Sequence, residues 1–357
     1  MMIARGLAVI AGMVIVYLGL ASAVKTFVLP RAAPDQLTRY VFLFLRFILH
    51  FFLKRARTYL ERDRVLAYYA PVGLLLLLPA WYLMVFFGYS LIFWGFGAQS
   101  WYLALRDSGS SLLTLGFETV NTLSFSLLAF SEAAIGLVLV ALLIAYLPTI
   151  YAAFSRRETL VTLLEVRAGD PPSAVEMIVR YYRIHGLGRL TEEWRRWEEW
   201  FADIQESHTS LAALVFFRSP QPSHSWITAA GAVLDTAAIS LAVLDIPNDP
   251  QAALCLRAGY LALRSIGDYF GLPYDPNPRP DAPTHIERMD FDTLVYTLEV
   301  EGVPLKADRE QAWRDYNGWR VNYGAVLLGL APLTNAPPAP WSSDRGTFGS
   351  IPSIFKK

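Results

Sequence analysis

The chain has little of what defines several large functional classes. Its single cysteine, Cys255, excludes an intramolecular disulfide framework and fits a reducing cytoplasm for the part that contains it. Only 17% of its 357 residues are charged and the net charge is zero. Because the basic residues form no extended stripe, nucleic-acid binding has no support.

The sequence also lacks motifs for enzyme chemistry. Its histidines are scattered rather than spaced as metal ligands, and Gly186 and Gly188 indicate a turn between helices rather than a phosphate-binding loop. No catalytic constellation is visible. We therefore predict a protein that is not an enzyme and that carries no organic or covalent cofactor.

Hydrophobic residues, in contrast, make up 54% of the chain, and nearly all the long apolar runs precede Ser155. The run from Ile3 to Leu29 is longer than the ~20 residues that a helix needs to cross a bilayer. We expect it to be an uncleaved helix, although Ala21-Ser22-Ala23 also resembles a signal-peptide cleavage site. The runs from Val65 to Gly97 and from Leu127 to Phe154 predict two more membrane-spanning helices.

The segment from Tyr40 to Leu53 leaves two alternatives open, a short tilted span or an amphipathic helix lying in the membrane interface. Basic residues follow it between Lys54 and Arg64, and Arg156 and Arg157 follow the last span. The positive-inside rule places both basic clusters in the cytoplasm. We expect a multi-pass protein of the cell (inner) membrane with a large cytoplasmic C-terminal domain.

The insert between the last two spans, from Ala98 to Ser126, contains the sequence T-L-G-F-E-T from Thr114 to Thr119. In this insert the chain resembles the bacterial two-helix potassium-channel family, whose filter reads T-V-G-Y-G-D. The resemblance implies an outer helix, a pore helix that ends near Leu113, a selectivity filter and an inner helix. It further implies a homotetramer in the lipid bilayer that conducts monovalent cations, with K⁺ as the permeant ion.

The resemblance assigns roles to the residues of the filter. Backbone carbonyls of Thr114, Leu115, Gly116 and Phe117 would replace the hydration shell of a monovalent cation. Gly116 tolerates the alternating backbone handedness that inward carbonyls require, and the Thr114 hydroxyl would add an oxygen at the inner site. Leu115 and Phe117 would point away from the axis and pack against the pore helix.

Glu118 departs from the family pattern, which has glycine at this position. Four copies would form an acidic ring at the outer mouth, next to Thr119. The Glu-Thr pair is similar to the T-I-G-E-T filter of cyclic-nucleotide-gated channels, which are weakly selective. The alternative within channels is therefore a weakly selective or divalent-sensitive cation pore.

Three residues of the expected inner helix are candidates for gating or filter support. Gly136 and Pro148 would act as gating hinges; alternatively, Gly136 allows close helix packing and Pro148 marks the membrane exit. Glu132 would lie at the outer interface or behind the filter as a hydrogen-bond partner.

The predicted fold is an all-α membrane protein: a tetrameric pore-loop channel module with a helical cytoplasmic domain that controls assembly or gating. Its expected parts are membrane helices in 1–64, the pore module in 65–158, the helical domain in 159–333 and a disordered tail in 334–357. In the helical domain, Trp194, Trp197 and Phe201 predict a core-facing stripe, and Trp226 to Leu244 predicts a buried helix. An alternative from another class is a non-conducting membrane-anchored sensor or scaffold.

Overall fold

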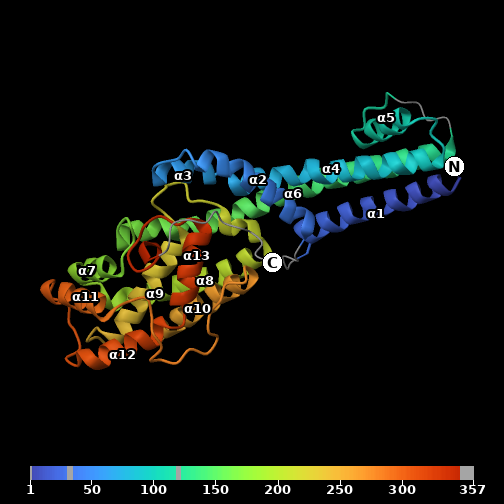
Figure 1. Ribbon diagram of the computed structural model, residues 1–357. Helices are drawn as coiled ribbons and strands as arrows, with labels where there is room; N and C mark the ends of the chain where they lie inside the picture. Colours follow the sequence, from blue (N-terminus) through green and yellow to red (C-terminus); the bar gives the residue numbers. More distant parts are fainter. Residues whose placement is uncertain (1, 30–34, 118–121, 346–357) are drawn as a thin grey trace. The chain divides into compact units, whose positions relative to one another are not determined.

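The computed structural model describes residues 2–29, 35–117 and 122–345, and these residues are all-helical (Figure 1). Among them, an isolated antiparallel bridge between Leu244 and Leu305 is the sole extended pairing. The predicted all-helical fold is thus confirmed for the described residues. The chain divides into two compact units, an N-terminal unit of Met1–Leu49 with Tyr68–Ala152 and a C-terminal unit of His50–Ala67 with Ala153–Lys357.

The N-terminal unit is built from long apolar helices, namely α1 (Met2–Phe27), most of α2 (Gln36–Leu53), α4 (Tyr69–Phe96), the shorter α5 (Trp101–Leu112) and the first part of α6 (Leu123–Ala168). Four helical stretches of the described residues are long and apolar enough to cross a membrane: Met2–Phe27, Gln36–Leu53, Tyr59–Phe96 and Leu123–Ala168. The expected membrane helices are confirmed in their length and apolar composition. For α2, a short tilted span and an interfacial helix both remain predictions.

Polar contacts join α1, α2 and α4 inside this unit. The Nε1 of Trp81 on α4 donates to Ser22 Oγ on α1 at 2.9 Å, and that hydroxyl donates to Asp35 at 2.6 Å. Asp35 also accepts from the backbone N–H of Thr38 at 2.8 Å, at the start of α2. The ring of Phe27 lies edge-on to Trp81, with 4.9 Å between centroids. These contacts satisfy polar groups that lipid could not.

The C-terminal unit contains shorter helices, several of which have side-chain N-caps. Its helices are α3 (Tyr59–Leu66), α7 (Ala174–Arg183), α8 (Leu190–Ser210), α9 (Trp226–Ala242), α10 (Pro250–Tyr269), α11 (Arg288–Val300), α12 (Arg309–Arg320) and α13 (Gly324–Thr334), with short 3₁₀ turns η1 (Leu187–Arg189), η2 (Ala212–Phe216) and η3 (Ser343–Arg345). Asp249 caps α10 and Asp308 caps α12, each accepting a backbone N–H.

The core of this unit is formed around α9, which is buried along almost its whole length. The aromatic stripe of α8 also packs inward, since Trp194, Trp197 and Phe201 are at most 1% exposed. Both predictions, the core-facing stripe and the buried apolar helix, are confirmed. Asp235 in the middle of α9 is paired with Arg320 and accepts a hydrogen bond from Tyr323 OH at 2.7 Å.

Two boundaries differ from those expected from sequence. Residues 50–67 group with the C-terminal unit, because Asp63 on α3 pairs with Arg218 there. The prediction of disorder from residue 334 is wrong for 334–345, where Ala336, Ala339 and Ser342 are buried. The Pro- and Ser-rich composition suggested a solvated tail, but its backbone supplies acceptors to neighbouring arginines, as Asn335 O does for Arg218 at 3.0 Å. Residues 346–357 lie outside the described ranges.

Candidate functional site

The candidate pore segment begins with α5, a helix between the two long helices α4 and α6 of the N-terminal unit. Ser100 caps its start by accepting the N–H of Leu103 at 3.3 Å. Its last turn is closed by two bonds, from Thr114 N to Ser111 O at 3.0 Å and from Leu115 N to Ser110 O at 2.8 Å. The helix therefore ends where the sequence predicted the pore helix to end, directly before the expected filter.

The backbone of 113–117 is irregular in a particular way. The residues with positive φ are Thr114 at 52° and Gly116 at 68°, whereas Leu115 between them is not in this region. A positive φ is easy for glycine but uncommon for threonine. Positive φ at Thr114 and Gly116 thus alternates with negative φ at Leu113 and Leu115. Glu118 and Thr119 lie outside the described residues.

The apolar side chains of this segment are only partly covered in the single chain. Leu115 is 58% exposed and Phe117 is 54% exposed. Phe117 contacts α5 through Arg106, whose guanidinium carbon lies 5.6 Å from the ring centroid. Packing of Leu115 against the pore helix is not seen in the single chain.

Behind α5, Glu132 on α6 is fully buried. The Oγ of Ser108 on α5 lies 2.5 Å from Glu132 Oε1 and 2.9 Å from the carbonyl oxygen of Phe86 on α4. The second carboxyl oxygen, Oε2, has no hydrogen-bond partner among the described residues. Ser108 and Glu132 thus join all three helices of the candidate pore module. The sequence left two positions for Glu132, the outer interface or a hydrogen-bonding position behind the filter. The contact with Ser108 corresponds to the second.

Gly136, one turn further along α6, lies against the end of α5. A Cβ at this position would meet the carbonyl oxygen of Leu112 at 2.6 Å, which is closer than real Cβ contacts come. Its own carbonyl accepts from Tyr82 OH on α4 at 2.8 Å. Gly136 therefore has the packing role, and a hinge role for it remains a prediction. Pro148 lies inside α6, which continues to Ala168.

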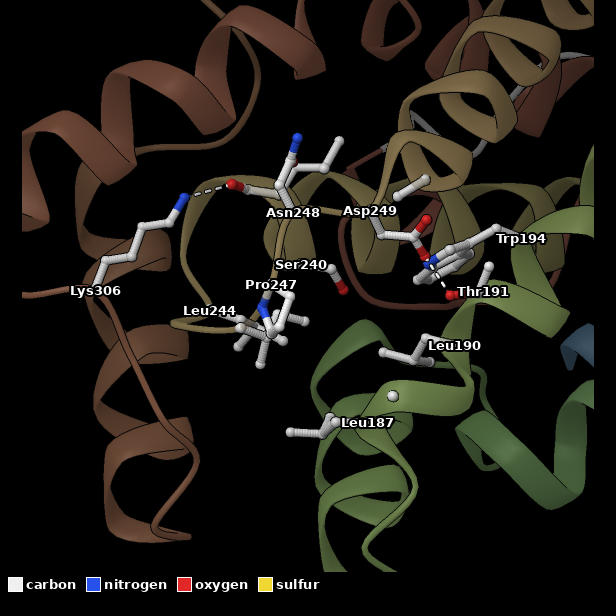
Figure 2. Close-up of a pocket in the computed structure, with 14 residues that line it drawn as sticks. Leu187, Leu190, Thr191, Trp194, Ser240, Leu244, Pro247, Asn248, Asp249 and Lys306 are labelled. Carbon is white, nitrogen blue, oxygen red and sulfur yellow. Dashed lines mark hydrogen bonds between the residues drawn. The ribbon is translucent and has the colours of Figure 1, made fainter.

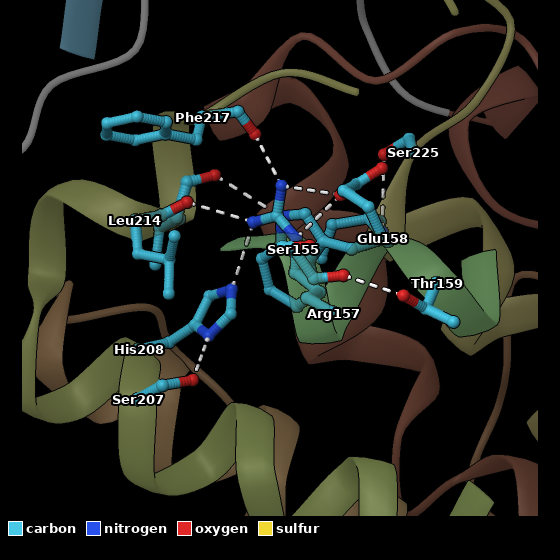
Figure 3. A network of polar contacts seen from close by, with 12 residues as sticks. Ser155, Arg157, Glu158, Thr159, Ser207, His208, Leu214, Phe217 and Ser225 are labelled. Atoms are coloured by element: carbon cyan, nitrogen blue, oxygen red, sulfur yellow. Dashed lines mark hydrogen bonds and ion pairs between the residues drawn. The ribbon is translucent and has the colours of Figure 1, made fainter. Parts of the chain in front are cut away.

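In the C-terminal unit, the last part of α6 carries a buried arginine. Arg157 is completely buried and donates to Glu158, to the carbonyls of Leu214 and Phe217 at 2.9 and 2.7 Å, and to Nε2 of His208 at 3.2 Å (Figure 3). Because a guanidinium can only donate, Nε2 accepts and the ring proton lies on Nδ1. Burial and the neighbouring positive charge of Arg157 hold the pKa of His208 well below its usual range. His208 is thus neutral at pH 7.

The C-terminal unit also contains a cavity of about 430 Å³, bordered by α8, the end of α9 and the loop before α10. Asp249 and Lys306 lie on opposite sides of it (Figure 2). Asp249 accepts from Thr191 Oγ1 at 2.7 Å, and Lys306 donates to the carbonyl of Leu241 at 2.6 Å. Both charged groups are engaged by the protein, so the cavity has no evident ligand preference.

No group of three or more potential metal-binding side chains, counting His, Cys, Asp and Glu, occurs among the described residues. Comparisons of the chain with family models, with curated proteins and with solved structures find no match. The sequence indicates Glu132 but not Ser108, which belongs to no motif. It places Arg157 in a basic cluster, and only the fold shows that this side chain is buried and which groups it binds.

Proposed function

We propose that four copies of this chain form a cation channel in the cell (inner) membrane. Thr114 to Glu118 form its filter, and K⁺ is the preferred ion. The observation that carries the proposal is the order of elements in the N-terminal unit. A spanning-length helix, α4, is followed by the short helix α5, by an irregular segment and by a second spanning-length helix, α6.

The backbone of the irregular segment supports an ion-binding role. In a bilayer, non-helical backbone persists only where it is buried in protein or lines a water-filled path. Positive φ at Thr114 and Gly116 supports a segment whose carbonyls would point at one axis, and rings of such carbonyls replace the hydration shell of a cation. A homotetramer follows from the proposal, since each chain supplies one side of the ring.

The exposed apolar side chains next to this backbone favour assembly. Leu115 and Phe117 are more than half exposed in the single chain. Assembly around an axis would cover these side chains with a neighbouring copy. Burial of apolar area stabilises by about 25 cal/mol per Å².

The contacts behind the segment would hold it in place. Glu132 and Ser108 fix the middle of α5, and the close approach of Gly136 to Leu112 fixes its end. A filter must keep its carbonyls at a constant distance from the ion, so a rigid support is part of the mechanism. Movement of α6, whose last part belongs to the C-terminal unit, would modulate opening from the cytoplasmic side.

Ion flux into liposomes that contain the full-length chain tests the proposal. We expect K⁺ flux above that of Na⁺ and Ca²⁺, and we expect Gly116→Ala to abolish it. Gly97→Ala is the matched control, because Gly97 also has positive φ and has no neighbour within 4 Å of an added Cβ, but lies outside the filter. Folded tetramers that pass no cation would overturn the channel proposal, and a folded monomer or dimer would favour the scaffold function.

A further inference from the structure

Five basic residues lie in the segment that begins directly after α2 and includes most of α3. Each of them is exposed, and none forms an ion pair with another described residue: Lys54, Arg55, Arg57, Arg62 and Arg64. We call this group the basic surface. It belongs wholly to the C-terminal unit.

The acidic residues of the same stretch are outnumbered by the basic ones, and their carboxylates bind other groups. Glu61 is used in the capping box of α3, where it accepts the backbone N–H groups of Arg57 and Thr58 at 2.6 and 3.4 Å. Asp63 is buried and paired with Arg218. The stretch 54–64 thus has five basic and two acidic residues, with both carboxylates directed to other partners.

The position of α3 is fixed by the face that carries Tyr59 and Asp63. Arg218 binds Asp63 and the hydroxyl of Tyr59, and it also donates to the carbonyls of Thr334 and Asn335 at 2.8 and 3.0 Å. These bonds hold α3 against the C-terminal unit. The basic surface is therefore presented by a docked helix and a capped turn rather than by a free loop.

Exposed aromatic residues precede the basic surface directly. Phe51 and Phe52 are 56% and 50% exposed, and the guanidinium of Arg55 lies 4.2 Å from the Phe51 ring centroid. Apolar rings followed by cations match the boundary between acyl chains and headgroups. A soluble anion would use the cations but would gain nothing from the aromatic rings.

We propose that the basic surface binds the headgroups of anionic phospholipids at the membrane surface. Each basic residue near an anionic membrane surface contributes roughly a fivefold gain in affinity, from about 1 kcal/mol per residue. Since α3 is bonded to Arg218, lipid binding would act directly on the C-terminal unit. The inference requires a chain inserted in a membrane but does not depend on ion conduction.

The test measures lipid affinity of the full-length chain in detergent, by titration with short-chain phosphatidylglycerol or phosphatidylcholine. We expect at least about tenfold tighter binding of phosphatidylglycerol. A variant with all five basic residues changed to Gln should lose this preference. If that variant does not fold, Arg62→Gln/Arg64→Gln should still weaken binding about tenfold or more.

The control variant changes three exposed arginines of the same unit that form no ion pair with described residues, Arg189→Gln/Arg195→Gln/Arg257→Gln. It should keep the preference for phosphatidylglycerol. Equal binding of the two lipids by the unmodified chain would overturn the proposal, as would an equal loss in the control. Displacement of phosphatidylglycerol by inorganic phosphate at equal concentration would show a phosphate site and would also overturn it.

Discussion

Replacing Arg157 by methionine tests whether the last part of α6 is held in the C-terminal unit by its buried guanidinium. In the unmodified chain the guanidinium donates to Glu158, His208 and two carbonyls, and its side chain has no exposed surface. Methionine fills most of the same volume but donates no hydrogen bond. The change therefore isolates the polar interactions from the packing.

The expected loss of stability follows from the buried acceptors that lose the Arg157 donor. Breaking a buried ion pair by removing one partner costs about 3–5 kcal/mol. For a domain of this size, each 1 kcal/mol lowers the melting temperature by about 2–4 °C. We therefore expect Arg157→Met to lower the melting temperature of the C-terminal unit by roughly 6–20 °C.

Arg156 supplies a matched control on the same helix. Its side chain is 58% exposed and is paired with Asp203 at 3.1 Å. Exposed pairs contribute about 0–1 kcal/mol, so Arg156→Met should lower the melting temperature by at most about 4 °C. Thermal unfolding of the full-length chain in detergent, followed by tryptophan fluorescence, measures both variants. Equal shifts for the two variants would refute the reasoning.

Three further changes test other parts of the structure. Because the pKa of His208 is depressed in the folded state, only the unfolded chain gains its proton as pH falls below about 6.5, which costs up to about 1.4 kcal/mol of stability per pH unit. His208→Gln should remove this loss from melting curves between pH 7.5 and 5.5, and an unchanged slope would contradict it. Asp235→Ala should lower the free energy of unfolding by about 3–5 kcal/mol by leaving Arg320 unpaired, whereas Asp235→Leu/Arg320→Met should recover most of that loss. If chemical denaturation shows the same loss for the single and the double variant, the two side chains do not act as a buried ion pair. Gly136→Ala should cost about 1–3 kcal/mol, because its Cβ meets a carbonyl of α5 at 2.6 Å, and an unchanged melting temperature would show that α5 moves freely.

Much of the fold could be predicted because its signals are local. Apolar runs longer than the bilayer needs predict the long helices. The N-caps of α10 and α12, Asp249 and Asp308, are local signals of the same kind. The stripe that includes Trp194 and Trp197 was correctly assigned to the core because its spacing matches one helix face. Composition was a poorer guide for residues 334–345, where the backbone of a Pro-rich segment is bound by Arg218 and Arg320.

The candidate site could be predicted only in its backbone part. The motif at Thr114 to Gly116 implies an irregular, glycine-dependent conformation, and the structure has positive φ at both ends of this tripeptide. The supports behind it are non-local: Ser108 and Glu132 are separated by 24 residues, and a single serine within a helix has no pattern of its own. The same holds for Gly136, because only the fold shows that the carbonyl of Leu112 leaves no room for a side chain there. A motif can therefore predict which backbone atoms would face an ion, whereas the side chains that hold this backbone in place are defined only by the packing of α4, α5 and α6.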